Sequence, residues 1–486
     1  MEIIVIGGGI GGIGAGLALS GPGRNVKIID RDASPPSVPM DELFDIWKRN
    51  GAPQIRHGHG FLARLLNLIR DRYPDLMQTL FAAGAREMKF DSTLPPSVKR
   101  RYRYKPGDED MSVLICRRTT LEYVMRDYVS KLPGVTFVSK ALVRGPIIEM
   151  DSDGIYVAKG VTIETAPGAQ EEMRADVLVD ASGRSSKFPV WMGKYGIAPE
   201  TKEEPVGILY YTRHFRLHPG QKEPEGVFGV ELNFIKYVTF PGDEGNFAVT
   251  LMVPEIETYM RERVTQAAVF DRVCRAFPGS ARWIDPSRAA PVTRVYGMGD
   301  LKSHWRTWTR NGKPLLKNFF AIGDSTIRTD PAYGRGCTFA VLQAHLLDEA
   351  LRETDDPVVR ARLFESKSEK QLRPIYNFMV KLDAQSIKRA KNAQDPNYRP
   401  SLKERMAKSF AENGARPAVE RDMRVRRVIL RAAHMLEGPN AWLKRPDVLV
   451  RMLIMWALPK RFKQEPNEES EPMPTRDQLI ELMQIE

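Results

Sequence analysis

Cysteine is scarce in this sequence. Its 486 residues include three, Cys116, Cys274 and Cys337, which lie far apart and form no CxxC pair. This spacing argues against a disulfide framework and a zinc site, and it fits a reducing, cytoplasmic compartment. The sequence also lacks any run of about 18 uncharged apolar residues, so we expect no segment that spans a bilayer. We predict a cytoplasmic protein that holds no metal ion.

Low-complexity tracts and internal repeats are absent as well. A composition of 42% hydrophobic and 28% charged residues is ordinary for a globular enzyme, and the length favours more than one domain. The net charge of +12 is scattered along the chain, which favours a solvated basic surface, with attraction to an anionic lipid surface as the alternative. No nucleic-acid-binding motif accompanies the charge, so no nucleic acid partner is expected.

A glycine-rich turn follows the first apolar run. Residues 2–6 predict a buried parallel strand, and Gly7, Gly9 and Gly12 then form the pattern GxGxxG before a helix of small residues. The first glycine permits a tight turn, the second lets the backbone approach a pyrophosphate, and the third lets the helix pack on the strand. The helix N-terminus then presents free N–H groups to the diphosphate.

A second apolar run, residues 25–29, ends in Asp30 and Arg31, which we predict to bind the nucleotide. An acidic residue at this distance from the glycines accepts hydrogen bonds from an adenosine ribose. It also indicates a free 2′-hydroxyl, as in FAD or NAD, rather than a 2′-phosphate. Strand, glycines, helix, strand and acid therefore occur in the order that a dinucleotide-binding domain requires.

Two later segments favour FAD over NAD. Residues 175–185 (ADVLVDASGRS) place Asp180 at the end of an apolar strand and before a turn. Residues 318–336 (NFFAIGDSTIRTDPAYGRG) join another apolar strand to a glycine-rich turn and a helix. No second GxGxxG follows a strand, so a nicotinamide cofactor must bind transiently, or a partner reductase must supply the electrons.

The second of these segments carries four predicted cofactor residues. Asp324, which follows Gly323, can accept a hydrogen bond from a ribityl hydroxyl. Gly334 and Gly336 let the backbone and a helix N-terminus approach the flavin ring. There the helix dipole favours negative charge on the reduced flavin.

Together the three motifs resemble the p-hydroxybenzoate hydroxylase-like superfamily of FAD enzymes, over residues 1 to about 350. The superfamily includes hydroxylases, epoxidases, halogenases and isoprenoid reductases. The chain departs from its pattern at residues 180–183, where Ala-Ser separates an Asp-Gly pair that is usually adjacent. The resemblance implies an α/β fold with a Rossmann-type FAD-binding domain of the GR2 type, an antiparallel β-sheet substrate domain and a C-terminal helical region.

The resemblance also implies roles for residues outside these motifs. Residues 53–76 look like a superfamily segment that begins with Arg-His-x-His, which puts His57 and His59 near the flavin, where a histidine can shuttle a proton. Arg118 stands where the superfamily has an arginine near the FAD diphosphate, and Pro331 stands where a proline abuts the ring. A structural role for the histidines and a surface position for Arg118 are the alternatives.

The pattern of the chain predicts four regions. They are a discontinuous FAD-binding domain (1–90, 112–185 and 300–350), a β-sheet substrate domain (91–111 and 186–299), a C-terminal helical region (351–462) and a polar tail (463–486). Aromatic residues of the sheet are candidates for the pocket lining: Tyr210, Tyr211, Phe228, Phe234, Tyr237 and Phe247. The apolar stretch 442–458 predicts a docking helix, with a peripheral membrane contact as the alternative.

The resemblance implies a flavin-dependent monooxygenase. Molecular oxygen is the co-substrate, and NAD(P)H supplies electrons directly or through a flavin reductase. The reactive species is the flavin C4a-(hydro)peroxide, which the protein positions and shields from water. We predict hydroxylation or epoxidation of a hydrophobic or aromatic small molecule, a reaction type common in secondary metabolism.

Three alternatives stay open. A flavin-dependent reductase of isoprenoid double bonds would share the fold and a lipophilic pocket. A halogenase is less favoured, because the sequence has no WxWxIP segment and no lysine obviously placed for halide transfer. A flavin-bearing RNA-modifying or interaction protein would make use of the basic surface.

Overall fold

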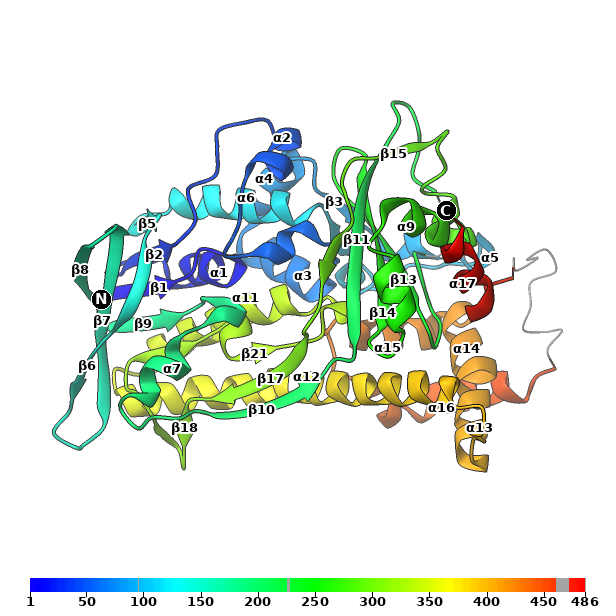
Figure 1. The fold of residues 1–486 in the computed structure, drawn as a ribbon. Helices are drawn as coiled ribbons and strands as arrows, with labels where there is room; N and C mark the ends of the chain where they lie inside the picture. Colours follow the sequence, from blue (N-terminus) through cyan, green and yellow to red (C-terminus); the bar gives the residue numbers. More distant parts are fainter. Residues whose placement is uncertain (95, 225–227, 460–471, 486) are drawn as a thin grey trace.

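Five parallel strands form the central sheet of the nucleotide-binding domain in the computed structural model, which describes residues 1–94, 96–224, 228–459 and 472–485 (Figure 1). The strand order is β20-β9-β1-β2-β5. Every pair is parallel, so the carboxyl ends of the strands lie at one edge and bring Gly7, Asp30, Asp180 and Gly323 together. The strands are β1 (Glu2–Ile6), β2 (Asn25–Asp30), β5 (Val135–Ser139), β9 (Val177–Asp180) and β20 (Phe319–Ala321).

Helices cover one face of this sheet and a second sheet covers the other. Val5 and Ile28 belong to a core shared with α1 and α11, whereas Ile4 and Leu178 pack against the antiparallel sheet β6-β7-β8. Burial on both faces explains why these strands are almost continuous apolar runs. The covering elements are α1 (Ile10–Leu19), α3 (Ala63–Arg72), α4 (Pro74–Ala82), α6 (Arg118–Ser130), α11 (Gly336–Glu353), β6 (Leu142–Met150), β7 (Tyr156–Ala166), β8 (Ala169–Arg174) and α7 (Phe188–Gly193).

A six-stranded antiparallel sheet forms the second domain, as the alternating pattern predicted. Its two faces differ: Tyr210 packs with Met252 and Leu301, whereas the next residue, Tyr211, packs in a core with the helices α8, α9 and α17. The strands are β11 (Ile208–Leu217), β12 (Gly229–Glu231), β13 (Lys236–Pro241), β14 (Asn246–Pro254), β15 (Ala289–Pro291) and β16 (Tyr296–Met298). The helices on this domain are α8 (Thr258–Arg263), α9 (Ala267–Arg275), α10 (Pro278–Ala281) and α17 (Arg476–Gln484).

A long helix runs below both domains in Figure 1 and joins them to the C-terminal region. This helix, α12 (Pro357–Gln394), begins where the Asp356 carboxylate accepts hydrogen bonds from the N–H groups of Val358 and Val359. A three-stranded sheet lies beside it in the order β10-β17-β21. Its strands are β10 (Glu200–Pro205), β17 (Lys302–Thr307) and β21 (Ile327–Arg328).

The helices of the C-terminal region pack around Val428, Val448 and Met452. One face of α16 docks there, as predicted, while Leu453 and Ile454 on another face are 49% and 56% exposed. A peripheral membrane contact of that exposed face stays a prediction. Among the described helices, none is both long and apolar enough to cross a membrane. The helices are α13 (Leu402–Phe410), α14 (Arg416–Arg421), α15 (Met423–Ala433) and α16 (Pro446–Ala457).

The prediction of a polar tail over 463–486 is wrong for part of that range. Residues 463–471 lie outside the described residues, but Arg476–Gln484 forms α17, and its Leu479 and Met483 are fully buried against the β-sheet domain. Thr475 starts this helix with a capping box, because its side chain accepts the N–H of Gln478. This apolar pair, four residues apart, is too short a pattern to stand out in a polar segment.

Residues 91–111 also pack differently from the prediction. Leu94, Val98 and Met111 form a cluster with residues of the C-terminal helical region, not with the β-sheet domain to which the segment was assigned. This segment contains only short elements, and its mostly polar sequence does not indicate these apolar contacts. The remaining short elements are α2 (Met40–Ile46), α5 (Pro96–Lys99), β3 (Arg86–Met88), β4 (Val113–Ile115), β18 (Thr309–Arg310) and β19 (Lys313–Pro314).

Candidate functional site

One cavity of about 450 Å³ extends from the carboxyl edge of the parallel sheet to the inner face of the β-sheet domain. Nearly all residues predicted from the sequence line it: Gly7, Gly9, Asp30, Arg31, His57, His59, Arg118, Gly323, Asp324, Pro331, Gly334 and Gly336. Gly12 does not line the cavity. The topology therefore brings together side chains that come from the first, second and fourth hundred residues of the chain.

The three glycines of the turn face different surroundings. A Cβ atom at Gly12 would lie 1.7 Å from the carbonyl oxygen of Gly7, so α1 packs on β1 more closely than any side chain permits. Gly7 adopts φ +103°, a conformation that favours glycine. At Gly9, by contrast, a Cβ atom would meet nothing within 4 Å. The space in front of the α1 N-terminus is therefore open, as a diphosphate requires.

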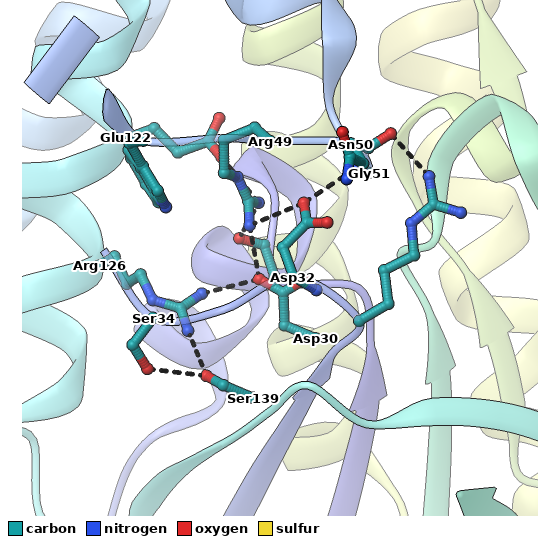
Figure 2. Close-up of polar contacts among 12 residues, drawn as sticks. Asp30, Asp32, Ser34, Arg49, Asn50, Gly51, Glu122, Arg126 and Ser139 are labelled. Carbon is teal, nitrogen blue, oxygen red and sulfur yellow. Dashed lines mark hydrogen bonds and ion pairs between the residues drawn. The ribbon is translucent and has the colours of Figure 1, made fainter. Parts of the chain in front are cut away.

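Asp30 lies in a buried cluster of charges at the end of β2 (Figure 2). Its Oδ2 atom accepts hydrogen bonds from Arg49 at 2.7 Å and Arg126 at 2.9 Å. Its Oδ1 atom accepts the N–H of Asp32 at 3.1 Å. No other donor among the described residues reaches Oδ1, so one of its lone pairs is available for a ribose hydroxyl.

Arg49 is the centre of this cluster. Its side chain is 1% exposed and lies 3.3 Å from Asp32 and 2.9 Å from Glu122, and it donates to the carbonyl oxygen of Gly8 at 2.9 Å. These contacts hold the loop after α2 against the glycine-rich turn. Arg31, in contrast, is exposed and donates to the Asn50 carbonyl at 2.7 Å.

Sequence reasoning missed Arg49, Glu122 and Arg126. Arg49 lies in a loop that carries no local motif, so only the tertiary structure reveals it. The other two had a signal: Arg118, Glu122 and Arg126 recur every four residues on α6 and all are buried. A charged stripe on the buried face of a helix indicates a polar site rather than a core.

The middle of the cavity carries Asp324 and Arg118. No hydrogen bond from the described residues reaches the Asp324 carboxylate, and burial raises its pKa. Arg118 donates to Nε2 of His59 at 3.1 Å and to Glu122 at 3.3 Å. The surface position considered for Arg118 is therefore wrong, since this residue is 8% exposed. An unbonded carboxylate in a cavity wall is a ready acceptor for a ligand hydroxyl.

Both predicted histidines are neutral at pH 7. Burial lowers the pKa of His57 to about 4 and that of His59 to about 3, and nearby arginines add to both shifts. The Nδ1–H group of His59 donates to the His57 carbonyl at 2.9 Å, and its Nε2 atom accepts from Arg118. His57 pairs through Nδ1 with Thr212, 2.9 Å away. His59 thus orients Arg118, and His57 is the histidine with a nitrogen left for proton transfer.

The far end of the cavity lies under the β-sheet domain. Of the aromatic residues proposed for its lining, Tyr210 alone borders the cavity. Side chains alternate along a strand, and Tyr211, Tyr237 and Phe247 point into the core on the opposite face. The lining at this end is mostly apolar and comprises Tyr210, Phe240, Thr250, Met252, Met298 and Leu301.

A tight turn at Pro331 separates the two ends. Pro331–Tyr333 forms one turn of 3-10 helix, and Gly334 closes it with φ +64°. A Cβ atom at Gly334 would lie 3.0 Å from the carbonyl oxygen of Gly60, so the turn packs closely on the segment that carries the two histidines. Arg335, which sequence reasoning missed, follows the turn, is 6% exposed and lies 5.6 Å from the ring of Tyr333.

These residues fit FAD as the ligand of the cavity. The free lone pair of Asp30, the open space at Gly9 and the unbonded carboxylate of Asp324 all lie in its lining. They match an adenosine ribose, a diphosphate and a ribityl chain in chemistry. Pro331 and the apolar side chains under the β-sheet domain line the same cavity.

Comparison with known proteins identifies the fold. No family model matches the chain. Protein Rv3254 of Mycobacterium tuberculosis is 24% identical over 377 residues, covering 72% of this chain and 72% of that protein. The flavin-dependent halogenase CmlS aligns with a TM-score of 0.60 and 17% identity, covering 90% of this chain and 76% of CmlS.

A second solved structure is similar to the same degree. PqsL of Pseudomonas aeruginosa, described as a probable FAD-dependent monooxygenase, aligns with a TM-score of 0.55 and 16% identity, covering 80% of this chain and 97% of PqsL. The chain therefore has the fold of these FAD-dependent enzymes, which confirms the predicted α/β fold with a Rossmann-type domain and an antiparallel β-sheet domain.

Proposed function

We propose that this protein is an FAD-dependent monooxygenase that hydroxylates or epoxidises a hydrophobic or aromatic small molecule. One observation carries the proposal: a single cavity joins the residues that fit FAD to an apolar chamber under the β-sheet domain. A cofactor ring at the Pro331 turn and a substrate under Tyr210 would share that space. The reactants would thus be held close together and away from water.

The cofactor end divides into binding and orienting residues. Gly9 and the α1 N-terminus would hold the diphosphate, Asp30 the ribose, and Asp324 the ribityl chain. Arg118, fixed by His59 and Glu122, would supply positive charge beside them. FAD bound here supplies two-electron redox chemistry and the activation of molecular oxygen.

The substrate end would exclude water and guide protons. Phe240, Met252 and Met298 make the chamber apolar, which favours an uncharged organic substrate. The neutral His57 can accept a proton, and the Thr212 and Thr250 hydroxyls continue its hydrogen-bond chain at 2.9 Å per step. Because His57 and Thr250 both line the cavity, such a chain would relay a proton between two points of its wall without admitting bulk water.

The charge at the cavity wall supports one source of electrons. Beyond the cofactor end and the buried Arg335, the lining includes four exposed or half-buried cationic residues, Arg184, Lys187, Lys302 and Arg328. A basic rim attracts an anionic dinucleotide, which supports transient reduction by NAD(P)H. Delivery of reduced flavin by a partner reductase is the other route.

A flavin-dependent halogenase is the second candidate, because CmlS has the same fold. Halide transfer by a lysine needs an amine beside the substrate. The lysines that line the cavity, Lys187 and Lys302, are both exposed, and Lys302 lies 3.5 Å from Glu203. Their positions at the surface favour oxygenation over halogenation.

The test uses the purified holoprotein with NADPH or NADH, ¹⁸O₂ and a panel of aromatic and isoprenoid compounds, with and without bromide. A product that carries one ¹⁸O atom and forms without halide supports the monooxygenase. A halogenated product that needs bromide supports the second candidate. Anaerobic saturation of an alkene would point to a reductase, and a protein that binds no flavin would contradict all three.

A further inference from the structure

Two buried carboxyl groups lie close together behind the wall of the cavity, beyond the residues assigned to the cofactor. Asp330 precedes the Pro331 turn, and Asp383 lies on α12, 53 positions later in the chain. Their exposed fractions are 2% and 3%. The pair therefore connects the turn beside the proposed flavin ring to the long helix that carries the C-terminal region.

Each carboxyl group accepts a hydrogen bond from a tyrosine of the cavity lining. Tyr210 donates its hydroxyl to Oδ1 of Asp330, and the N–H of Ala332 donates to the same atom at 2.9 Å. Tyr333 donates its hydroxyl to Oδ1 of Asp383 at 2.9 Å. Both tyrosines border the cavity, so each hydroxyl links one carboxyl group to the cavity through a hydrogen bond.

No cation neutralises the pair within the described residues. Neither carboxylate forms an ion pair, and the charged side chain that affects both, Lys236 on β13, is itself paired with Glu231 at 3.1 Å. The hydroxyl of Tyr376, on the same helix as Asp383, forms no hydrogen bond with either carboxyl group. The pair is therefore surrounded by hydroxyl groups, a paired lysine and apolar side chains.

A buried pair of this kind cannot carry two negative charges at low cost. Burial raises the pKa of Asp330. Burial raises the pKa of Asp383 to about 9, and the facing Asp330 carboxyl group adds to the rise. Burial also raises the pKa of Tyr210 and Tyr333, so both hydroxyls stay protonated. At neutral pH the pair thus retains a proton that an exposed aspartate would lose.

We propose that Asp330 and Asp383 share one proton and exchange it with the cavity through Tyr210 and Tyr333. This inference rests on the proposed function for its purpose, because oxygenation requires protons at a site closed to water. When a basic oxygen in the cavity takes the Tyr210 hydroxyl proton, that O–H bond breaks and Asp330 returns a proton to the tyrosine oxygen. No electrons move, and the pair recovers its proton from solvent water after turnover.

The first experiment detects the proton itself. Infrared spectroscopy of the holoprotein separates the C=O stretch of a protonated carboxyl group from that of carboxylates. Burial also raises the pKa of Glu365 to about 7, so the quantity measured is the wild-type spectrum minus that of Asp383→Asn. We expect this difference to show a protonated-carboxyl band at pH 7 and to lose it as the pH rises past about 9. The difference between the wild type and the control Asp355→Asn, whose side chain is fully exposed, should show no such band.

A second readout separates proton transfer from a structural role. Tyr210→Phe keeps the ring and removes the hydroxyl, and we expect it to lower kcat about 100-fold while KM changes little. Circular dichroism and flavin content serve to show that the variant is folded and loaded. If this variant keeps the wild-type kcat, the proposed proton exchange between the carboxyl pair and the cavity is wrong.

The two proposals fail in different ways. If the difference between the wild-type and Asp383→Asn spectra shows no carboxyl band at pH 7, the shared proton is overturned whatever reaction the protein catalyses. If the band behaves as expected but no oxygenated product forms from any reductant, the proposed function fails while the proton-holding pair stands.

Discussion

Two buried groups of carboxylates lie near the same cavity, one at its adenosine end and the other behind the tyrosines of its substrate end, and their charges are balanced in different ways. At the adenosine end, Asp30 accepts hydrogen bonds from both Arg49 and Arg126. At the substrate end, Asp330 and Asp383 face tyrosines and each other, and no guanidinium group is bonded to them within the described residues. Cations balance the negative charge of the first group, whereas the second group limits its negative charge by holding a proton.

The difference follows from what each end must do. Three carboxylates and three guanidinium groups meet around Arg49, and these ion pairs hold a loop against the glycine-rich turn. A nucleotide needs such a fixed frame. A group that must give and recover protons instead needs a pKa shifted towards the working pH, so that it can change between its protonated and ionised forms.

The largest expected effect is at the open glycine of the adenosine end. Gly9→Glu inserts bulk and negative charge where the diphosphate would lie, so we expect the variant to retain no flavin. Absorbance of the purified protein at the flavin bands measures this. Gly21→Glu, at a glycine that also has nothing within 4 Å, should stay fully loaded. A yellow, stoichiometrically loaded Gly9→Glu protein would contradict the diphosphate assignment.

Removal of the central cation should destabilise the whole domain. Arg49→Met leaves Asp30, Asp32 and Glu122 short of one buried positive charge, and breaking a buried ion pair in this way costs about 3–5 kcal/mol. Urea unfolding measures the change in the free energy of unfolding. Arg31→Met, which loses one hydrogen bond at the surface, should cost well under about 1 kcal/mol. Equal losses of unfolding free energy in the two variants would contradict the stabilising role of Arg49 in the cluster.

Asp324 lies between the two ends of the cavity, and its substitution tests whether it belongs to the cofactor site. It has neither a bonded cation nor a facing carboxylate, so its free oxygens are expected to serve the ligand. A hydrogen bond to a charged group contributes about 1.5–3 kcal/mol, so Asp324→Asn should weaken flavin binding by roughly 10- to 100-fold. Fluorescence titration of the flavin-free protein measures it, with Asp127→Asn on α6 as the unaffected control. An unchanged dissociation constant would remove Asp324 from the cofactor site.

Much of the adenosine end was predictable from the sequence, because its motifs are short and contiguous in the chain. GxGxxG, the acid at position 30 and the Gly323-Asp324 pair each lie next to an apolar strand, and parallel strands carry their carboxyl ends to one edge. Arg49 was not predictable in the same way. Its three carboxylate partners come from separate segments, and no pattern in its own loop identifies it.

The substrate end was hidden for a related reason. Asp383 lies on a helix of 38 residues with charges all around it, and only the packing of α12 decides which of them is buried. The aromatic residues of the sheet were over-counted, because alternation along a strand shows that two faces exist but not which face borders the cavity. Tyr210 and Tyr211 are adjacent, and only the former faces it.

The pH dependence of stability most sharply separates the two carboxylate groups. An unfolded aspartate has a pKa near 3.9, whereas that of folded Asp383 is about 9, so between these values the folded protein binds the extra proton. Unfolding then releases a proton, and the free energy of unfolding falls as pH rises, by at most about 1.4 kcal/mol per pH unit. Asp383→Asn cannot titrate, so its stability should decline less steeply than that of the wild type between about pH 5 and 8. Urea unfolding at several pH values measures both slopes, and parallel slopes would mean that the pair is already ionised in the folded protein.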